Sequence, residues 1–398
     1  MNKLPVQPKK RIELLDVFRG FAVFGIFVVN IEIMNCVFMN QDVFSKQWTD
    51  PIDTLTTRIF QLFFYSKFFP IFSFLFGLGI SMQALSMSQK NELTFSFFAR
   101  RMLILFFFGV LHILLLWSGD VIHLYAILGL FVTLLIKKSN RLIIGLSVLF
   151  LIFPFYDQIA AYAFQLMKYQ PESYLSGYMP ETIVETIRNG SYVDGIRLRA
   201  NEYMANIPML FTFLAPVALS MFLLGLYFGK NSLITKMNVL VDLLKKPVII
   251  IAIITNLYRI IFLFFLPGFE IYKSPVARPV FLKLMFLSDV VMGLFYLWLL
   301  AWLWYHTNAR KIISPLKYVG RMALTNYIMH SFIGLLLFSS IGFSLYETMS
   351  PSETLFTALV VFCVQILYSK LWLRYFKFGP LEWVWRCFTY KKLLPMKK

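Results

Sequence analysis

The residues best suited to chemistry lie in a short polar stretch between two apolar runs. Asp120 and His123 are three residues apart there, in a chain with only four histidines. A carboxylate beside an imidazole fixes its tautomer and raises its basicity, as a general base acting on a hydroxyl requires. His112, eight residues earlier, could assist. The alternative interpretation is that Asp120 caps a helix and His123 is an interfacial anchor.

A second polar pattern lies on the first apolar run. Asp16 and Arg19 are about one helical turn apart, and Asn30 follows Arg19 by eleven residues, about 16 Å along a helix. The three side chains therefore share a face and could mark a polar seam through a membrane. The alternative is an interfacial ion pair between Asp16 and Arg19, with Asn30 joining two helices.

Basic side chains offer a third kind of site. Arg100 and Arg101 begin one apolar run, and Arg321 lies near the start of another. Guanidinium groups match phosphate geometry, although positive charge at the inner end of a membrane helix explains the same pair. Asn326 and His330 lie one turn apart, and a hydrogen bond between helices is favoured over a catalytic role.

Composition identifies the class of protein. Of the 398 residues, 59% are hydrophobic, and the mean hydropathy is +0.70, so a water-soluble domain is excluded. The formal charge of +18 falls mostly in alternate loops, which indicates membrane orientation and attraction to anionic lipids rather than nucleic acid. Three scattered cysteines predict no disulfide or metal site.

The apolar runs predict an all-α polytopic membrane protein of about ten transmembrane helices in one domain, 1–398. The expected spans are 14–36, 58–84, 99–117, 120–136, 142–166, 206–229, 247–267, 281–305, 318–342 and 354–376. Basic connections alternate with acidic ones, which predicts that both termini are cytoplasmic. Pro70 is expected to kink the second span.

Four segments outside the spans have distinct compositions. We expect a cytoplasmic N-terminus at 1–13 and a long extracytoplasmic segment at 168–204. We also expect a cytoplasmic interfacial segment at 230–246 and a cytoplasmic basic tail at 377–398. Membrane lipids are the expected partners, in a bacterial cytoplasmic membrane.

Several of these stretches together resemble the YeiB-like family of bacterial membrane proteins. The matching stretches are LDVFRGFA at 15–22, KFFPIFSFLFGLG at 67–79, RR at 100–101, GDVIHLY at 119–125, GRMALTNY at 320–327 and FGPLEWVWR at 378–386. The C-terminal part corresponds to that family's domain of unknown function. The order and spacing of the stretches cover nearly the whole chain.

At one remove, the family is similar to integral-membrane acyltransferases of the heparan-sulfate acetyltransferase type. The resemblance implies acyl-CoA binding from the cytoplasm and transfer to an acceptor across the membrane. Arg19 and Asn30 match the Arg and Asn of the relatives' first helix. The heparan-sulfate enzyme has a histidine soon after that asparagine, but this chain has none before His112. Asp120 and His123 would therefore supply the base.

Three functions follow from these patterns. In an acyltransferase, Arg19, Arg100, Arg101 and Arg321 would hold acyl-CoA, while Asn30 polarises the thioester carbonyl. The acceptor would be a glycan, a lipid headgroup or a small molecule. In a transporter or exporter, Asp120 and His123 would form a proton-coupling pair. In a non-enzymatic lipid-binding or stress-response protein, the polar cluster would be structural.

Overall fold

The computed structural model describes residues 11–36, 40–89 and 92–398, so most of the predicted N-terminal segment lies outside it. Within these ranges the regular structure is helical, apart from one isolated bridge between Phe376 and Lys397. Seven segments there are long and apolar enough to cross a membrane, or eight if one bent pair counts as a span. The predicted all-α polytopic fold is confirmed.

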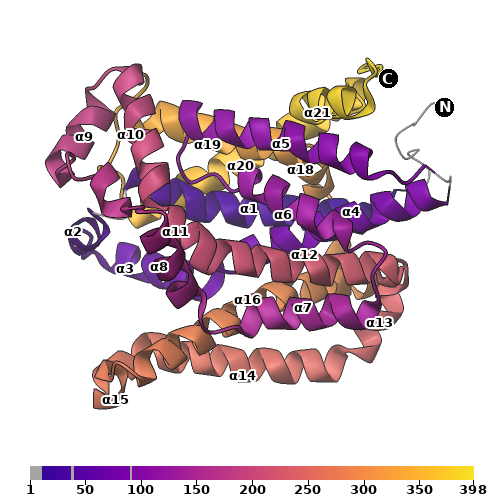
Figure 1. Ribbon diagram of the computed structural model, residues 1–398, viewed down its shortest axis with the longest axis horizontal. Helices are drawn as coiled ribbons and strands as arrows, with labels where there is room; N and C mark the ends of the chain where they lie inside the picture. Colours follow the sequence, from indigo (N-terminus) through magenta and orange to yellow (C-terminus); the bar gives the residue numbers. More distant parts are fainter. Residues whose placement is uncertain (1–10, 37–39, 90–91) are drawn as a thin grey trace.

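The seven long segments lie side by side, most of them along the long axis of the molecule (Figure 1). They are α1 (Glu13–Asn35), α3 to α4 (Pro51–Ser88), α5 (Phe95–Leu115), α11 to α12 (Ile207–Lys230), α14 (Lys245–Phe264), α16 (Ala277–His306) and α20 (Pro351–Tyr375).

All ten predicted apolar runs are largely helical, but besides the second run, which is broken at residues 65–67, three differ from a straight full-length span. Helices α6 (Ile122–Leu134) and α19 (Ala323–Phe338) contain 13 and 16 residues. The fifth run divides into α7 (Asn140–Ile152) and α8 (Tyr156–Leu166), which are bent by 80° at Pro154 and its neighbours. The bend follows from the proline, which cannot continue the hydrogen-bond ladder of α7.

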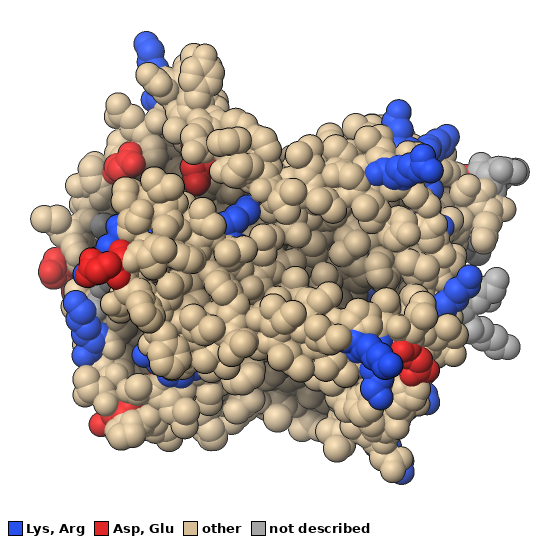
Figure 2. Space-filling model, turned by 90° about the horizontal axis from the view of Figure 1, so that it is seen from below, with Lys and Arg blue, Asp and Glu red and all other residues tan. Residues whose placement is uncertain are grey.

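The exterior has the pattern expected of a protein in lipid. Large apolar side chains are exposed on the outer helices, and on α14 these include Ile250, Ile253 and Ile254. Seen from the α14 side, charged residues gather toward the two ends of the molecule, with an uncharged belt between them (Figure 2). An apolar belt of this kind is suited to the hydrocarbon core of a bilayer.

The second span is broken before the predicted kink. A π-helical turn, Phe60–Phe64, ends α3 (Pro51–Ile59), and Ser66 has a φ of 62°. Helix α4 then begins at Phe68, which leaves Pro70 in its first turn, where a missing amide hydrogen costs nothing. The interruption therefore lies at residues 65–67.

Shorter helices occupy both ends of the bundle (Figure 1). The segment 168–204 holds α9 (Pro180–Arg188) and most of α10 (Tyr192–Ala205), and 230–246 holds α13 (Met237–Leu243). Within the predicted tail 377–398, residues Pro380–Tyr390 form helix α21. The remaining short helices are α2 (Gln41–Lys46), α15 (Glu270–Lys273), α17 (Arg310–Ile313) and α18 (Leu316–Arg321).

Helices α4 and α12 (Ala215–Lys230) form the tightest pair at the centre of the bundle. A Cβ on Gly77 would lie 2.1 Å from the carbonyl oxygen of Phe222, and one on Gly225 would lie 2.2 Å from that of Phe74. The two backbones can approach so closely only because both positions lack side chains.

Candidate functional site

The hairpin between α5 and α6 brings three of the predicted residues into direct contact. Asp120 lies in the connecting turn and is buried, as are His112 on α5 and His123 on α6. The Oδ1 atom of Asp120 is 2.7 Å from Nδ1 of His112, and Oδ2 is 3.0 Å from Nδ1 of His123. Asp120 therefore bridges two imidazoles.

Asp120 also has the capping role that the sequence left open. Its Oδ2 atom accepts a hydrogen bond of 3.0 Å from the backbone nitrogen of His123, in the first turn of α6. A carboxylate there satisfies an amide that has no partner within the helix. The capping and imidazole-binding interpretations hold together, because one carboxylate has enough lone pairs for both.

The free ring nitrogens distinguish the two histidines. With an ionised Asp120, both Nδ1 atoms donate, so each neutral ring has its lone pair on Nε2. Nε2 of His123 is 2.9 Å from the hydroxyl of Tyr203. Nε2 of His112 is buried without a hydrogen-bond partner, and this ring packs beside Tyr327 of α19. Of the two Nε2 atoms, that of His112 alone has no hydrogen-bond partner among the described residues.

Close approach of α5 and α6 depends on Gly109. A Cβ there would lie 2.3 Å from the backbone nitrogen of His123 and 2.8 Å from Oδ2 of Asp120. Any side chain would push the hairpin apart at the point where the carboxylate meets the imidazole. The glycine is thus part of the site, although it carries no chemistry.

Helix α10 covers this hairpin with three polar residues that the sequence reasoning missed. Tyr203 contacts His123, Glu202 accepts a 2.8 Å hydrogen bond from Ser118, and Arg199 donates to the Leu114 carbonyl. Burial raises the pKa of Glu202 to about 7, against the lowering effects of Ser118 and Arg199. The spacing of 199, 202 and 203 matches one helix face and was the available signal.

A separate cluster of arginines lies near the chain's described N-terminus. Arg19 forms a 3.0 Å ion pair with Asp16, which also pairs with Arg11. The charges of Arg19 and Arg386 act on Arg101, and those of Arg11 and Asp16 act on Arg321.

The cluster has more cationic than anionic side chains. Nε of Arg321 is buried without a partner. Asp16 is shared by two arginines, and Glu382 is occupied by α19, where it accepts from the backbone of Leu324 and Thr325. Burial lowers the pKa of Arg386, and the charges of Arg11 and Arg19 lower it further. Unbalanced guanidinium groups of this kind are suited to an anion.

Helix α21 completes the arginine cluster and separates the two predicted neighbours. The guanidinium of Arg101 lies 3.6 Å from the ring centroid of Trp385, whose Nε1 donates to the Arg101 carbonyl. Arg100 instead donates to the Thr389 carbonyl, at 2.8 Å. Arg101 therefore lies with Arg19 and Arg386, whereas Arg100 fastens α21 to α5. Arg386 was missed as a site residue, although it stands in the matching stretch 378–386.

Three curated proteins match this chain over nearly their whole lengths. One is the uncharacterized protein YxaH of Bacillus subtilis, which is 28% identical over 99% of this chain and 98% of its own length. Another is the uncharacterized protein YeiB of Escherichia coli, which is 27% identical over 96% of this chain and 97% of its own length. An uncharacterized 39.9 kDa protein in the amylase 3′ region of Bacillus acidopullulyticus is 29% identical over 98% and 97%. The profile of a protein family of unknown function, DUF418, matches residues 228–392. The chain is therefore similar to YeiB-like proteins over nearly its whole length, and its C-terminal part matches the family of unknown function.

The family profile covers part of the arginine cluster and none of the α5–α6 hairpin. Residues 228–392 of this YeiB-like chain contain Arg321 and Arg386 but none of the residues of the α5–α6 hairpin. The hairpin lies in the region shared with the full-length relatives. The names of these relatives and of the family assign no activity.

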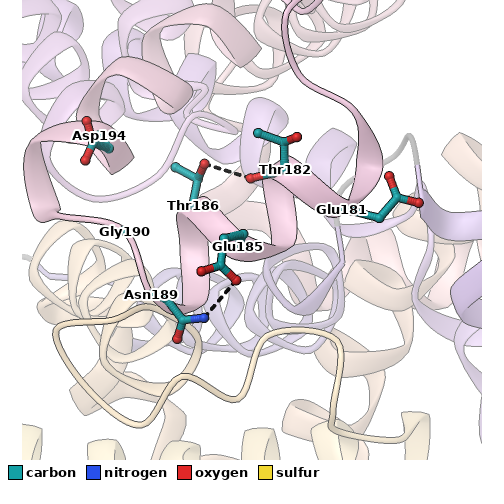
Figure 3. Close-up of a pocket in the computed structure, with 7 residues that line it drawn as sticks. All are labelled: Glu181, Thr182, Glu185, Thr186, Asn189, Gly190 and Asp194. Carbon is teal, nitrogen blue, oxygen red and sulfur yellow. Dashed lines mark hydrogen bonds between the residues drawn. The ribbon is translucent and has the colours of Figure 1, made fainter.

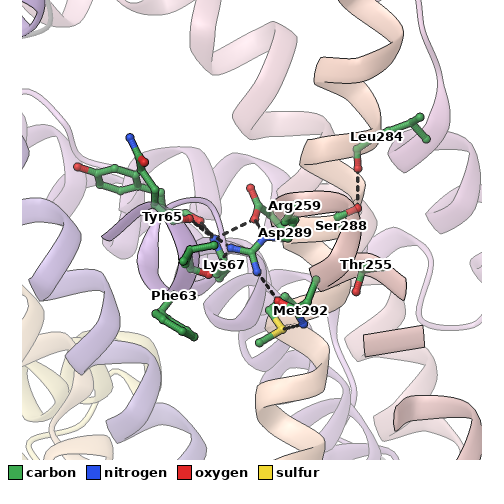
Figure 4. A network of polar contacts seen from close by, with 12 residues as sticks. Phe63, Tyr65, Lys67, Thr255, Arg259, Leu284, Ser288, Asp289 and Met292 are labelled. Atoms are coloured by element: carbon green, nitrogen blue, oxygen red, sulfur yellow. Dashed lines mark hydrogen bonds and ion pairs between the residues drawn. The ribbon is translucent and has the colours of Figure 1, made fainter. Parts of the chain in front are cut away.

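The largest polar cluster that sequence reasoning missed is an ionic group at the break in the second span (Figure 4). Lys67 and Arg259 are fully buried, and each pairs with Oδ1 of Asp289, at 2.8 and 2.9 Å. Lys67 also donates to the carbonyls of Gln61 and Tyr65, which the π-turn leaves without helical partners. The three charged residues could be seen within apolar runs of the sequence, but their spacing did not show that they contact one another.

The other predicted residues lie outside these clusters. The described residues provide no hydrogen-bond partner for Asn30, and it contacts neither Asp120 nor the histidines through a polar bond. Asn326 donates to Ser369 at 3.1 Å, and Nε2 of His330 lies 2.8 Å from Oε1 of Gln365. Both residues link α19 to α20, which agrees with the favoured structural interpretation.

An open cavity of about 450 Å³ lies between α9 and α10, away from the imidazole pair (Figure 3). Glu181, Glu185 and Asp194 line it, and the Glu185 carboxylate accepts a hydrogen bond from Asn189. Among the described residues, no group of three His, Cys, Asp or Glu side chains is placed to hold a metal ion. We assign the cavity no role.

Proposed function

We propose that this YeiB-like protein is an integral-membrane acyltransferase that moves an acyl group from acyl-CoA to a hydroxyl acceptor. The observation that carries the proposal is the buried carboxylate that bridges two imidazoles, one of which has an unpartnered Nε2 atom. A neutral imidazole held in this tautomer is suited to removing a proton from a hydroxyl.

His112 acts as the base in this proposal, and His123 takes the supporting place. Nε2 of His123 is already engaged by Tyr203, whereas Nε2 of His112 is free to accept a proton. Asp120 holds both rings and stabilises the imidazolium that forms. Helix α10 covers the pair, so that Glu202 and Tyr203 border the place where an acceptor would enter.

The arginine cluster supplies the donor end. Arg19, Arg101, Arg321 and Arg386 bind the phosphates of CoA from the cytoplasm. Arg101 and His112 are eleven residues apart on α5, about 16 Å along the axis, which suits an extended pantetheine arm. Asn30 lies at the same distance from Arg19 on α1. None of the described residues forms a hydrogen bond with its amide, which would donate to the thioester carbonyl.

The proposed transfer exchanges the thioester of the donor for an ester of the acceptor. His112 takes the acceptor's hydroxyl proton while that oxygen bonds to the acyl carbon. The carbon–sulfur bond then breaks, the sulfur leaves with the electron pair, and the imidazolium returns its proton to the thiolate. The products are an ester of the acceptor and free CoA.

The first experiment measures the thermal stability of the detergent-purified protein with and without CoA and short-chain acyl-CoAs. A ligand at a hundred times its dissociation constant stabilises the folded state by about 2.7 kcal/mol. Arg101→Ala should abolish the shift. Arg141→Ala, an exposed arginine in the first turn of α7, should keep it. No shift at millimolar CoA would refute the donor assignment.

A transporter or exporter of a small or amphipathic molecule is the second candidate. The observation that favours it is the interrupted span beside Lys67, Arg259 and Asp289, because transporters use broken helices and buried charges along their pathways. CoA binding separates the two. A CoA-dependent shift with hydroxyl acylation supports transfer, whereas proton-coupled uptake into vesicles without CoA binding supports transport.

A further inference from the structure

A groove of about 390 Å³ runs between α14 and α16 on the exterior of the bundle. Helix α14 forms one wall, with Ile249 and Ile253, and α16 forms the other, with Trp298 and Trp302. Apart from Lys245 at one end and Asn256 at the other, the residues that line it are apolar. The groove opens on the face where α14 exposes its isoleucines, so lipid tails reach it directly.

The only charged lining residue is Lys245, the first residue of α14. Within the described part of the chain it has no ion pair, because the nearby Asp242 is taken by His306 at 3.0 Å. An exposed ammonium at the end of an apolar helix lies where lipid phosphates are found. The groove thus offers a positive charge for a headgroup and apolar walls for a chain.

The length of the groove fits one leaflet. Lys245 and Asn256 are eleven residues apart, which is about 16 Å of helix, roughly half of the ~30 Å hydrocarbon core. At the far end the side-chain Oδ1 atom of Asn256 accepts a 2.8 Å hydrogen bond from Arg259, so the groove ends at the buried ionic group. A single acyl chain would run from the headgroup level to the middle of the bilayer.

We propose that this groove binds one anionic phospholipid, with its phosphate at Lys245 and one acyl chain between α14 and α16. The site is independent of the acyl-transfer proposal, since it shares no residue with the imidazole pair or the arginine cluster. Trp298 and Trp302 pack along the chain, and Lys245 selects the headgroup by charge.

The test is lipid binding to the full-length detergent-purified protein, measured by native mass spectrometry with dioleoyl phosphatidylglycerol and dioleoyl phosphatidylcholine. Two pairs of variants separate the parts of the site. Lys245→Ala removes the charge, and Lys246→Ala removes the neighbouring exposed charge that does not line the groove. Ile249→Trp fills the groove, and Ile250→Trp adds the same bulk outside it.

We expect the wild type to retain one phosphatidylglycerol molecule in preference to phosphatidylcholine. Lys245→Ala should weaken that binding about fivefold, the equivalent of about 1 kcal/mol per surface lysine. Ile249→Trp should abolish it, and both controls should bind as the wild type does. Equal binding of the two lipids, or full binding by Ile249→Trp, would overturn the proposal. A dimer that Ile249→Trp dissociates would overturn it too, by assigning the groove to a second copy.

Discussion

Asp120→Asn is expected to move a proton from one nitrogen of His112 to the other while the fold stays intact. Asparagine keeps the shape of aspartate but replaces one acceptor oxygen with an NH2 donor. Oδ2 of Asp120 accepts both the backbone and the ring hydrogen bonds of His123, and Oδ1 accepts only from His112. The amide oxygen should therefore face His123. In that orientation only the hydrogen bond with His112 is mismatched, whereas the reverse orientation mismatches both hydrogen bonds with His123.

The NH2 group then faces Nδ1 of His112. That nitrogen must become an acceptor, so its proton moves to Nε2 and the lone pair proposed as the base is lost. The reverse amide orientation leaves the backbone amide of His123 unpaired, at a cost of about 1–3 kcal/mol. The preferred orientation is thus favoured about fivefold to 150-fold. Loss of the base should lower acyl transfer by about 10²–10⁴-fold.

Nitrogen-15 NMR of protein labelled only at histidine reads these tautomers without any substrate. The chain has four imidazoles, which single-histidine variants assign. His112 and His123 should both carry the proton on Nδ1 in the wild type, and only His123 should do so in Asp120→Asn. Asp157→Asn, at an exposed carboxylate, should leave the spectrum unchanged. Nε2 protonation of both rings in the wild type would refute the reasoning.

Three further predictions concern the supports of these sites. Gly109→Ala should destabilise the protein by about 1–3 kcal/mol in denaturation experiments, because the new Cβ would lie 2.3 Å from the backbone nitrogen of His123. Unchanged stability would contradict the close packing of the hairpin. Asp289→Asn should cost about 3–5 kcal/mol by leaving two buried cations unpaired, whereas Lys67→Met should cost less because the pair with Arg259 remains. The raised pKa of Glu202 means that the folded protein holds its proton more tightly than the unfolded chain. Stability should therefore fall as pH rises from 4.5 to about 7. Glu202→Gln should lose that part of the pH dependence of the melting temperature, and an identical pH profile in the variant would count against the assignment.

Local patterns predicted the fold well because hydrophobic length and periodicity are local properties. Asp120 and His123 could likewise be paired from sequence, since residues three apart at a helix start must be neighbours. The sequence could not show that Asp120 also holds His112, because that contact depends on how α5 packs against α6. Gly109 makes the packing possible but carries no recognisable motif.

The missed residues depend on contacts between distant segments. Lys67 lies in the break of the second span, whereas Arg259 and Asp289 lie on α14 and α16, and the three meet next to the π-turn. Tyr203 reaches His123 only because α10 folds back over the hairpin. Side-chain chemistry alone ranks such residues no higher than any other tyrosine or lysine.

The docking of α21 on α5 has a consequence for biosynthesis. Trp385 and Arg101 are 284 residues apart, so α5 is made long before its partner exists. At about 5–20 residues per second, roughly 15–60 s separate the two. During that interval Arg101 lacks the aromatic surface that holds it, and Glu382 has not yet capped α19. The arginine cluster is therefore completed only after the other helices have been synthesised.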